Sequence, residues 1–215
     1  MYCFDCKKER DVSKYITEDA YTDPKTGVLL NRLGLTNQDE LDKAEAAYVA
    51  TRSIELAYRP LTISSECAYT LEHLQAIHKK LFGDVYEWAG QVRTIDISKG
   101  NTRFAHHGTI KREAQRLTRQ LADEHYLKGL DREEFSRRVG FYMGELNVLH
   151  PFREGNGRTL REYVRQLAHD AGFTIRWDQI DPENLIDAAI HAYHGQSSFL
   201  ARIIYENSYS ISVSP

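Results

Sequence analysis

Apolar residues recur at helical spacing along most of the chain, and this periodicity predicts a mainly helical protein. After Thr70 one helical face is apolar, and it consists of Leu71, Leu74, Ile77, Leu81 and Phe82. After Asp131 a narrower apolar stripe, with alternating gaps of four and three residues, consists of Phe135, Val139, Tyr142, Leu146 and Leu149. Both stripes predict helices that bury one face in a shared core.

Capping residues, prolines and glycines predict where the helices begin and end. The Asp131 helix should end at His150, because Pro151 disfavours helical geometry in the residue before it. Asp181 followed by Pro182 is a favourable start, since aspartate caps a helix and proline fits its first turn. The predicted helices run from Thr36 to about Tyr58, from Thr70, from Thr109 to about Leu127, from Asp131 to His150, from near Gly155 to Gly172, from Asp181, and from about Gln196 to Asn207.

One segment between these helices breaks the helical pattern. The stretch "QVRTIDISKGNTRFAHH" (91–107) alternates, turns at "KGN" and resumes at "TRF", which is typical of a β-hairpin. The polar start of the chain, residues 1–20, is expected to form an N-terminal arm, and residues 208–215 a loose C-terminal tail. The prediction is an all-α fold with one small β-hairpin, in which residues 21–207 form a single domain.

The composition argues against several classes of protein. The chain has 215 residues, 41% of them hydrophobic, which is enough for a core and argues against disorder. A net charge of −3 gives no basic excess for nucleic acid, and no apolar run approaches the ~18 residues of a membrane helix. The start, "MYCFDCKKER", has no secretory pattern, so we expect a cytoplasmic protein, with export as an effector left open. Cys3 and Cys6 form half of a zinc motif that no second pair completes, and we expect reduced thiols there.

The stretch "HPFREGNGRTLR" (150–161) contains the residue types of an anion-binding site. It lies between two predicted helices, so Gly155, Asn156 and Gly157 fall where backbone N–H groups have no partner within the helix. A helix N-terminus carries partial positive charge, and glycines let a ligand approach the backbone closely. Arg158 and Arg161 share a helical face and add full charges that suit phosphate oxygens. The stretch therefore predicts a site for a ligand with several phosphates.

Two further residues give this anion site a chemistry. The carboxylate of Glu154 would repel phosphates unless a cation lay between them, and Mg²⁺ commonly bridges carboxylates and nucleotide phosphates. His150 can titrate near neutral pH and can remove a proton from an incoming hydroxyl. Together they predict transfer of a phosphorus group from a Mg-nucleotide to a hydroxyl. Each residue alone has a structural explanation, such as a pair between Arg158 and Glu162, but the combination in this order favours a site.

The same stretch matches a family signature. Residues 150–161 fit His-Pro-Phe-x-(Asp/Glu)-Gly-Asn-Gly-Arg-x-x-Arg without a gap, and the sequence therefore resembles Fic-domain proteins. The segment "LFGDVYEWAGQVRTIDI" (81–97) is similar to the second family signature, which leads into a flap hairpin. The segment "YTDPKTGVLLNRLGL" (21–35) is similar to the family's N-terminal arm. The resemblance covers about residues 20–207 and implies a Fic-type helical fold.

The resemblance implies an enzyme, a protein adenylyltransferase that transfers AMP from ATP to a hydroxyl side chain of a target protein. His150 would be the catalytic base, Glu154 would hold Mg²⁺, and Phe152 would anchor the loop in the core. The ATP phosphates would be bound by Gly155, Asn156, Gly157, Arg158 and Arg161. The flap that docks the target would comprise Ile97, Ser98, Lys99, Asn101, Thr102, Arg103 and Phe104. The adenine side would contain Tyr193 and Gln196, from "HAYHGQ" (191–196).

The resemblance also implies a partner. Family members are commonly inhibited by a glutamate within Ser/Thr-x-x-x-Glu-Gly/Asn, but the residues four positions before Glu154, Glu183 and Glu206 are neither serine nor threonine. This is similar to the toxins whose inhibitor is a separate small antitoxin that carries the motif, with Arg161 as the receiving group. We therefore expect Arg158 and Arg161 to be unpaired in the isolated chain. The toxin role implies bacterial type II topoisomerase subunits as targets.

Three other functions fit parts of the sequence. A secreted effector would modify a host protein with the same chemistry. A Fic-related phosphotransferase would carry a lysine at the position of Gly157, so the glycine argues against it. A non-catalytic nucleotide-binding module would not need His150. We expect no membrane partner and no direct nucleic-acid partner.

Overall fold

Helices form most of the protein in the computed structural model, and the all-α fold class is confirmed. The residues that the structure describes are 19–61, 64, 67–100 and 102–211. The expectations for Cys3, Cys6 and Asn101 fall outside these residues, as do those for most of the arm (1–18) and for the end of the tail (212–215).

The helices follow the apolar stripes of the sequence. They are α1 (Gln38–Tyr58), α2 (Leu71–Phe82), α3 (Ile110–Asp123), α4 (Arg132–Leu149), α5 (Asn156–Asp170), α6 (Pro182–Tyr193) and α7 (Ser198–Asn207). Short 3-10 turns lie at His107–Thr109, His125–Leu127 and Trp177–Gln179. Asp131 and Asp181 cap α4 and α6 as predicted, because their carboxylates accept backbone N–H groups of the first turn.

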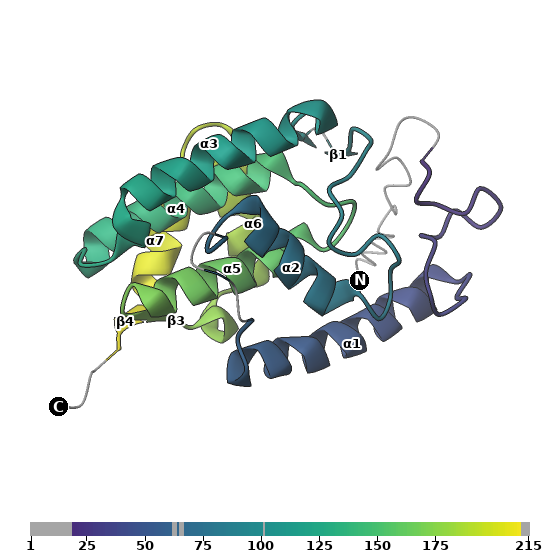
Figure 1. Ribbon diagram of the computed structural model, residues 1–215, viewed down its shortest axis with the longest axis horizontal. Helices are drawn as coiled ribbons and strands as arrows, with labels where there is room; N and C mark the ends of the chain where they lie inside the picture. Colours follow the sequence, from purple (N-terminus) through teal and green to yellow (C-terminus); the bar gives the residue numbers. More distant parts are fainter. Residues whose placement is uncertain (1–18, 62–63, 65–66, 101, 212–215) are drawn as a thin grey trace, which may run out of the picture.

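The α4 helix lies at the centre of the helical packing. It contacts α3, α5, α6 and α7, while α2 contacts both α5 and α1. In Figure 1, α3 and α4 run along the top of the molecule, α2 and α5 cross its middle, and α1 runs along the bottom. Gly140 lets α7 approach α4 closely, since a Cβ added there would lie 2.7 Å from the backbone nitrogen of Ala201. The stretch 150–161 joins the central helix α4 to α5 and forms the first turns of α5.

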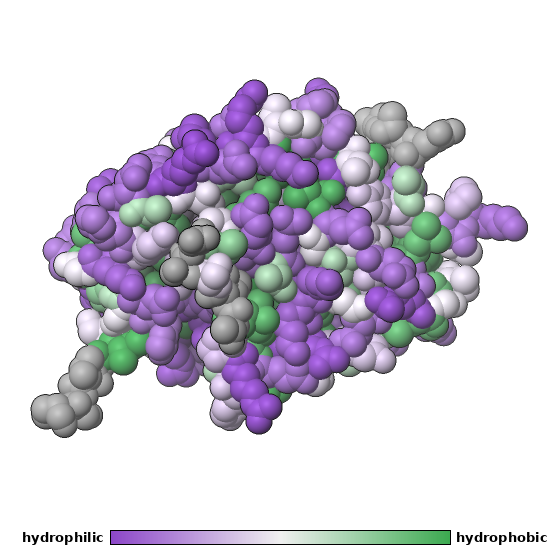
Figure 2. All heavy atoms as spheres, in the orientation of Figure 1, coloured by the Kyte–Doolittle hydropathy of each residue, from purple (hydrophilic) through white to green (hydrophobic). Residues whose placement is uncertain are grey.

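The face shown in Figure 2 is mostly hydrophilic, with small hydrophobic areas between the charged side chains. Within the described ranges, no helix combines the length and the apolar content that a bilayer crossing requires.

The predicted hairpin is confirmed, and a second small sheet was missed. Strands β1 (Ser98–Lys99) and β2 (Thr102–Arg103) pair antiparallel. Strands β3 (Phe173–Ile175) and β4 (Ser208–Ser210) also pair antiparallel. The prediction of a loose tail from residue 208 is therefore wrong for Ser208–Ser210, where pairing with β3 supplies backbone partners that an isolated strand lacks.

Two helix boundaries also differ from the prediction. The cap of α1 is Asn37 rather than Thr36, because the Asn37 side-chain oxygen accepts the N–H of Glu40 at 3.1 Å. The α3 helix ends at Asp123, four residues before the predicted Leu127. Left-handed φ angles of 52°, 55° and 61° at three successive residues, the last of them Leu127, turn the chain and bury the leucine.

Candidate active site

The loop between α4 and α5 begins with a sharp reversal of the backbone at His150. His150 ends α4 with left-handed dihedral angles, φ 46° and ψ 63°. Its Nδ1 lies 3.1 Å from the carbonyl oxygen of Asn147, and its ring stacks on Phe104 with 3.7 Å between centroids. A carbonyl oxygen can only accept, so Nδ1 carries the proton and Nε2 the lone pair. The predicted base is therefore held in one orientation and one tautomer.

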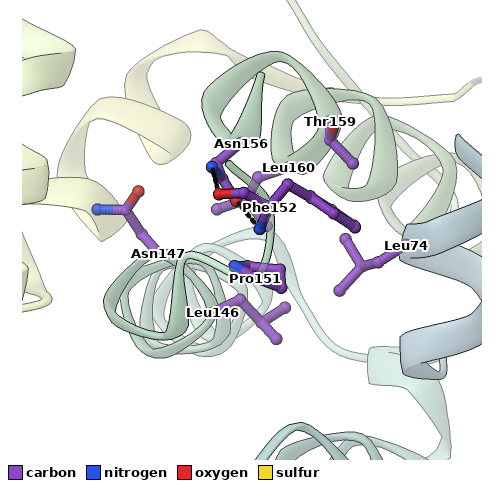
Figure 3. Close-up of a pocket in the computed structure, with 8 residues that line it drawn as sticks. All are labelled: Leu74, Leu146, Asn147, Pro151, Phe152, Asn156, Thr159 and Leu160. Atoms are coloured by element: carbon purple, nitrogen blue, oxygen red, sulfur yellow. Dashed lines mark hydrogen bonds between the residues drawn. The ribbon is translucent and has the colours of Figure 1, made fainter. Parts of the chain in front are cut away.

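The loop closes on itself through Asn156, as Figure 3 shows. The Asn156 amide oxygen accepts the N–H of Phe152 at 2.8 Å, and its amide nitrogen donates to the Phe152 carbonyl at 2.8 Å. Phe152 is buried, and together with Leu74 and Leu160 it lines a small pocket behind the loop. The Asn156 side chain thus shapes the loop, while its backbone N–H lies in the first turn of α5.

Two glycines flank Asn156 for different reasons. Gly155 has a left-handed φ of 78°, and a Cβ added there would lie 2.3 Å from the ring of Phe82, so only glycine fits. A Cβ added at Gly157 would come no closer than 3.8 Å to any neighbour, and that neighbour is the guanidinium of Arg161. The side of α5 next to Gly157 is therefore open to a ligand that approaches the helix N-terminus.

Two arginines of the first turns of α5, Arg158 and Arg161, lie beside this opening. The Nη2 of Arg158 lies 2.6 Å from Oε1 of Glu45 and 4.0 Å from Oε1 of Glu154. Its guanidinium lies over the ring of Phe82, 4.7 Å from the centroid. Burial, and then the charge of Arg158, lower the pKa of Arg161. The expectation that both arginines are unpaired is wrong for Arg158, because the sequence search considered only one glutamate motif and Glu45 does not match it.

Glu154 is the carboxylate that can hold a metal ion at this turn. Its side chain is 30% exposed, and one of its oxygens accepts the N–H of Gly155 at 3.1 Å. Mg²⁺ bound to nucleotides is often held by one or two carboxylates together with phosphate oxygens, so a single carboxylate beside an anion site fits it. A separate group at the base of the flap, Asp96, His106 and His107, brings three possible ligand atoms within 4.8 Å of one another.

Arg93 joins the base of the flap to the end of α4, and sequence reasoning missed it. The side chain is buried, and its Nε donates to the carbonyl of His150 at 2.8 Å and an Nη to that of Leu149 at 3.2 Å. The other bonds, both 2.5 Å long, reach the carbonyls of Ile95 and Ala105 on the two sides of the hairpin. The one sequence signal was an arginine inside an alternating apolar segment. Arg93 therefore holds the flap base and the catalytic turn together.

The flap residues divide into a buried base and an exposed tip. Ile97 and Phe104 are buried, whereas Lys99 and Arg103 are exposed. Across the hairpin, Ser98 is opposite Arg103 and Lys99 is opposite Thr102. The base of the flap is thus packed into the domain, whereas the described residues of the tip lie at the surface.

The residues predicted for the adenine side lie at and just beyond the end of α6. The hydroxyl of Tyr193 donates to the carbonyl of Arg103 at 2.9 Å, so this end of α6 touches the flap. The side-chain oxygen of Gln196 lies 3.0 Å from Nδ1 of His191. The structure therefore brings Tyr193 to strand β2 and pairs Gln196 with a residue of α6.

His78 of α2 supports the loop from the core. Its Nδ1 accepts the N–H of Gly90 at 2.8 Å, so Nε2 carries the proton and donates to the carbonyl of Glu154 at 3.0 Å. The ring stacks between Phe82 and Phe152, with centroid distances of 4.7 Å and 3.9 Å. Burial lowers the pKa of His78 to about 4, so the ring is neutral at physiological pH.

The N-terminal arm reaches the same loop. Asp19 forms an ion pair with Arg153, which is buried, and accepts the hydroxyl of Thr22 at 2.7 Å. Burial alone would raise the pKa of Asp19, but hydrogen bonds from Arg153 and Thr22 hold it below its ordinary value. The arm thereby fixes Arg153, which occupies the variable position after His-Pro-Phe in the signature.

Comparison with known proteins places this geometry in a family. The Fic/DOC family model matches residues 68–168. Fic of Salmonella typhimurium strain LT2 is 38% identical over 192 residues, which cover 89% of this chain and 92% of that protein. The chain belongs to the Fic/DOC family. The protein adenylyltransferase VbhT of Bartonella schoenbuchensis is 50% identical over 191 residues, which cover 89% of this chain. The predicted resemblance and the enzyme class are thus confirmed at the level of the family.

Solved Fic structures have the same fold and carry nucleotides. The N-terminal Fic domain of a VirB-translocated Bep effector protein from Bartonella quintana, with bound ADP, has a TM-score of 0.83 at 26% identity and covers 88% of this chain and 94% of that one. BepC from Bartonella tribocorum, with bound AMPPNP, has a TM-score of 0.82 at 25% identity and covers 88% of this chain and 96% of that one. By contrast, this Fic domain spans only 39% of the length of VbhT.

Substitution of Arg93 should destabilise the domain. Arg93→Lys should lower the free energy of unfolding by about 2–4 kcal/mol, because one ammonium cannot reach carbonyls on both the flap and α4, and unpaired buried carbonyls are costly. Urea unfolding followed by circular dichroism measures the change. Arg112→Lys is the matched control, since that side chain is 75% exposed, and its effect should stay within about 0.5 kcal/mol. Equal unfolding midpoints for the two variants would show that Arg93 does not hold the flap base and the end of α4 together.

Acidification should weaken the support from His78. The pKa of His78 is about 4 in the folded chain and 6.5 for a solvent-exposed histidine, so the contribution is complete above pH 6.5 and is lost as pH falls towards 4. The loss is on the order of 3 kcal/mol. Chemical unfolding measured at several pH values should show this decline.

A variant that cannot titrate separates His78 from the other histidines. His78→Gln retains a donor and an acceptor, and its free energy of unfolding should fall less steeply below pH 6.5. Some decline should persist, because burial also lowers the pKa of His73. His169→Gln, at a side chain 68% exposed, should follow the wild-type curve. A His78→Gln curve parallel to wild type would contradict the assignment.

Proposed function

We propose that this Fic domain is a Mg²⁺-dependent protein adenylyltransferase that transfers AMP from ATP to a hydroxyl side chain of a target protein. The observation that carries the proposal is the geometry of residues 150–161. They combine a base of fixed tautomer, a helix N-terminus open to anions, and two arginines on its first turns. The bound ADP and AMPPNP in the two Bartonella structures support a nucleotide as co-substrate.

In this proposal the triphosphate lies along the N-terminus of α5. The backbone N–H groups of Gly155, Asn156 and Gly157 bind phosphate oxygens, because they face no carbonyl of their own helix. The guanidinium groups of Arg158 and Arg161 bind the outer phosphates. Glu154 holds Mg²⁺, and that ion, when bound, supplies positive charge that offsets the charge of the phosphates.

His150 acts on the target hydroxyl. Its Nε2 takes the hydroxyl proton while the hydroxyl oxygen attacks the α-phosphorus, and the bond from that phosphorus to the bridging oxygen of pyrophosphate breaks. The products are AMP esterified to the target and pyrophosphate. The stack on Phe104 and the bond to Asn147 keep Nε2 directed at one place, so the base needs no reorientation.

Target docking is assigned to the flap. An extended segment of the target pairs with the hairpin, as in other cases where a peptide adds a strand to an exposed edge. The residues assigned to docking are Ile97, Ser98, Lys99, Asn101, Thr102, Arg103 and Phe104. Tyr193 and Gln196 are assigned to the adenine side, and Tyr193 also ties α6 to the flap.

The biological role that we infer is the toxin of a toxin–antitoxin pair in the cytoplasm. The support is the identity of 50% to VbhT and the missing Ser/Thr-x-x-x-Glu-Gly/Asn motif, which a small antitoxin would provide on its own helix. Bacterial type II topoisomerase subunits are the proposed targets. A translocated effector is the second candidate, because the two solved relatives, at 26% and 25% identity, belong to Bep effector proteins.

Transfer should depend on His150 and on the α-phosphate of ATP. Incubation of the chain with bacterial lysate and ATP labelled at the α-phosphate should label a protein, and ATP labelled at the γ-phosphate should not. His150→Ala should reduce labelling by about 10²–10⁴-fold, the usual contribution of a general base, while affinity for ATP changes little. His169→Ala, on the exposed face of α5, is the matched control. Labelling from the γ-phosphate alone would indicate a phosphotransferase instead.

Expression in bacteria should separate toxin from effector. Induction of the wild-type chain should stop growth, and His150→Ala should not, because a toxin harms the cell through its catalysis. Co-expression of a small protein with the inhibitory motif should restore growth. Unimpaired growth together with labelling of a protein in eukaryotic lysate would instead favour the effector.

A further inference from the structure

The buried face of α1 contains a carboxylate. The buried residues of this helix are Leu41, Glu45, Val49 and Leu56, so Glu45 lies in the middle of an apolar stripe. Glu45 is 7% exposed. An ionised carboxylate without partners would be costly at such a position. Its partners therefore explain why a glutamate occupies this place.

Both carboxylate oxygens of Glu45 have a partner, one on the side of the site and one on the side of the core. Oε1 lies 2.6 Å from Nη2 of Arg158, and Oε2 accepts the hydroxyl of Tyr86 at 2.5 Å. Tyr86 is buried, and burial together with the charge of Glu45 raises the pKa of its phenol, so the hydroxyl stays protonated and donates. Tyr86 thus fixes the carboxylate from the core while Arg158 binds it from the site.

The same contacts fix the guanidinium of Arg158. It lies over the ring of Phe82, and the side chain is still 30% exposed towards the anion site. A guanidinium has five N–H donors on three nitrogens, and the ion pair with Glu45 involves one nitrogen, Nη2. A long side chain that is already held loses less conformational freedom when a phosphate binds.

We propose that Glu45 is a positioning residue that orients Arg158 for the nucleotide phosphates before ATP binds, with Tyr86 holding the carboxylate in place. This inference rests on the proposed function, because it assumes that Arg158 binds a phosphate. The opposite role for Glu45 would be to compete with phosphate for Arg158. Such a competitor would have to release Arg158 when the nucleotide arrives, but Glu45 is bonded to a buried tyrosine and lies within the packed face of α1.

Nucleotide affinity tests the sign of this effect. Isothermal calorimetry with Mg-AMPPNP should show a Kd about three- to tenfold higher for Glu45→Gln, the range expected when one long side chain must be ordered on binding. Glu55→Gln is the matched control, because Glu55 is also on α1 and also pairs with basic residues, Arg52 and Lys80. Its Kd should equal that of wild type. An unchanged or lower Kd for Glu45→Gln would overturn the proposal, and a lower one would indicate competition.

A double-mutant cycle tests whether Glu45 acts through Arg158. In an Arg158→Met background, Glu45→Gln should cause no further change in the Kd of Mg-AMPPNP. An equal loss in both backgrounds would overturn the proposal, since Glu45 would then act by another route. Tyr86→Phe should raise the Kd in the same direction as Glu45→Gln but by less. If Glu45→Gln does not fold, an unchanged Kd for Tyr86→Phe overturns the proposal.

The transfer assay tests the proposed function, and the Kd of Mg-AMPPNP tests the role of Glu45, so the two can be contradicted separately. If no lysate protein accepts AMP but Mg-AMPPNP binds, the transfer reaction is wrong and the Kd series still decides the role of Glu45. If transfer occurs, Glu45→Gln should raise the KM for ATP by the same factor as the Kd and change kcat by less than that factor. A loss of kcat alone, at unchanged KM, would contradict positioning of the bound phosphates.

Discussion

The end of α4 at His150 is the constraint on which the site depends. Pro151 prevents the helix from continuing, and the last carbonyls of α4 then lack partners within the helix. Arg93 supplies donors to two of them and places a positive charge at the negative end of the helix. Arg93 also donates to carbonyls on both sides of the hairpin, at its foot. The turn that orients the His150 imidazole and the foot of the flap therefore form one hydrogen-bonded unit.

The loop after His150 needs support from several distant parts of the chain. Its own side chains close it, through the two bonds between Asn156 and the backbone of Phe152. Further support comes from distant segments, among them His78 from α2, Glu45 from α1 and Asp19 from the arm. A loop between two helices cannot pair all of its backbone groups within itself, so neighbouring elements fix it from behind.

The sequence predicted the features that depend on neighbouring residues and missed those that depend on partners far away in the chain. The helices and the turn between α4 and α5 were predictable because helical periodicity and the proline and glycines of the turn are local properties of the sequence. Glu45 and Arg93 were not, since a charged residue in an apolar stripe shows that a partner exists but not which one. The strand at Ser208–Ser210 was missed for a similar reason, because its partner, β3, lies more than thirty residues earlier. Asn156 was predicted from its position to bind phosphate, and the structure adds that its side chain bonds to the loop backbone.

Positive charges at the start of α5 are offset by carboxylates from other parts of the chain. Arg158 and Arg161 stand close enough for the charge of one to lower the pKa of the other, and both lie near the positive end of a helix. Glu154 and Glu45 offset this charge from two sides, one at the mouth of the site and one in the core. The difference in burial gives them different roles. The partly exposed Glu154 would be able to exchange partners in the proposed complex with a nucleotide and its cation, whereas the buried Glu45 would become an uncompensated charge if it left Arg158.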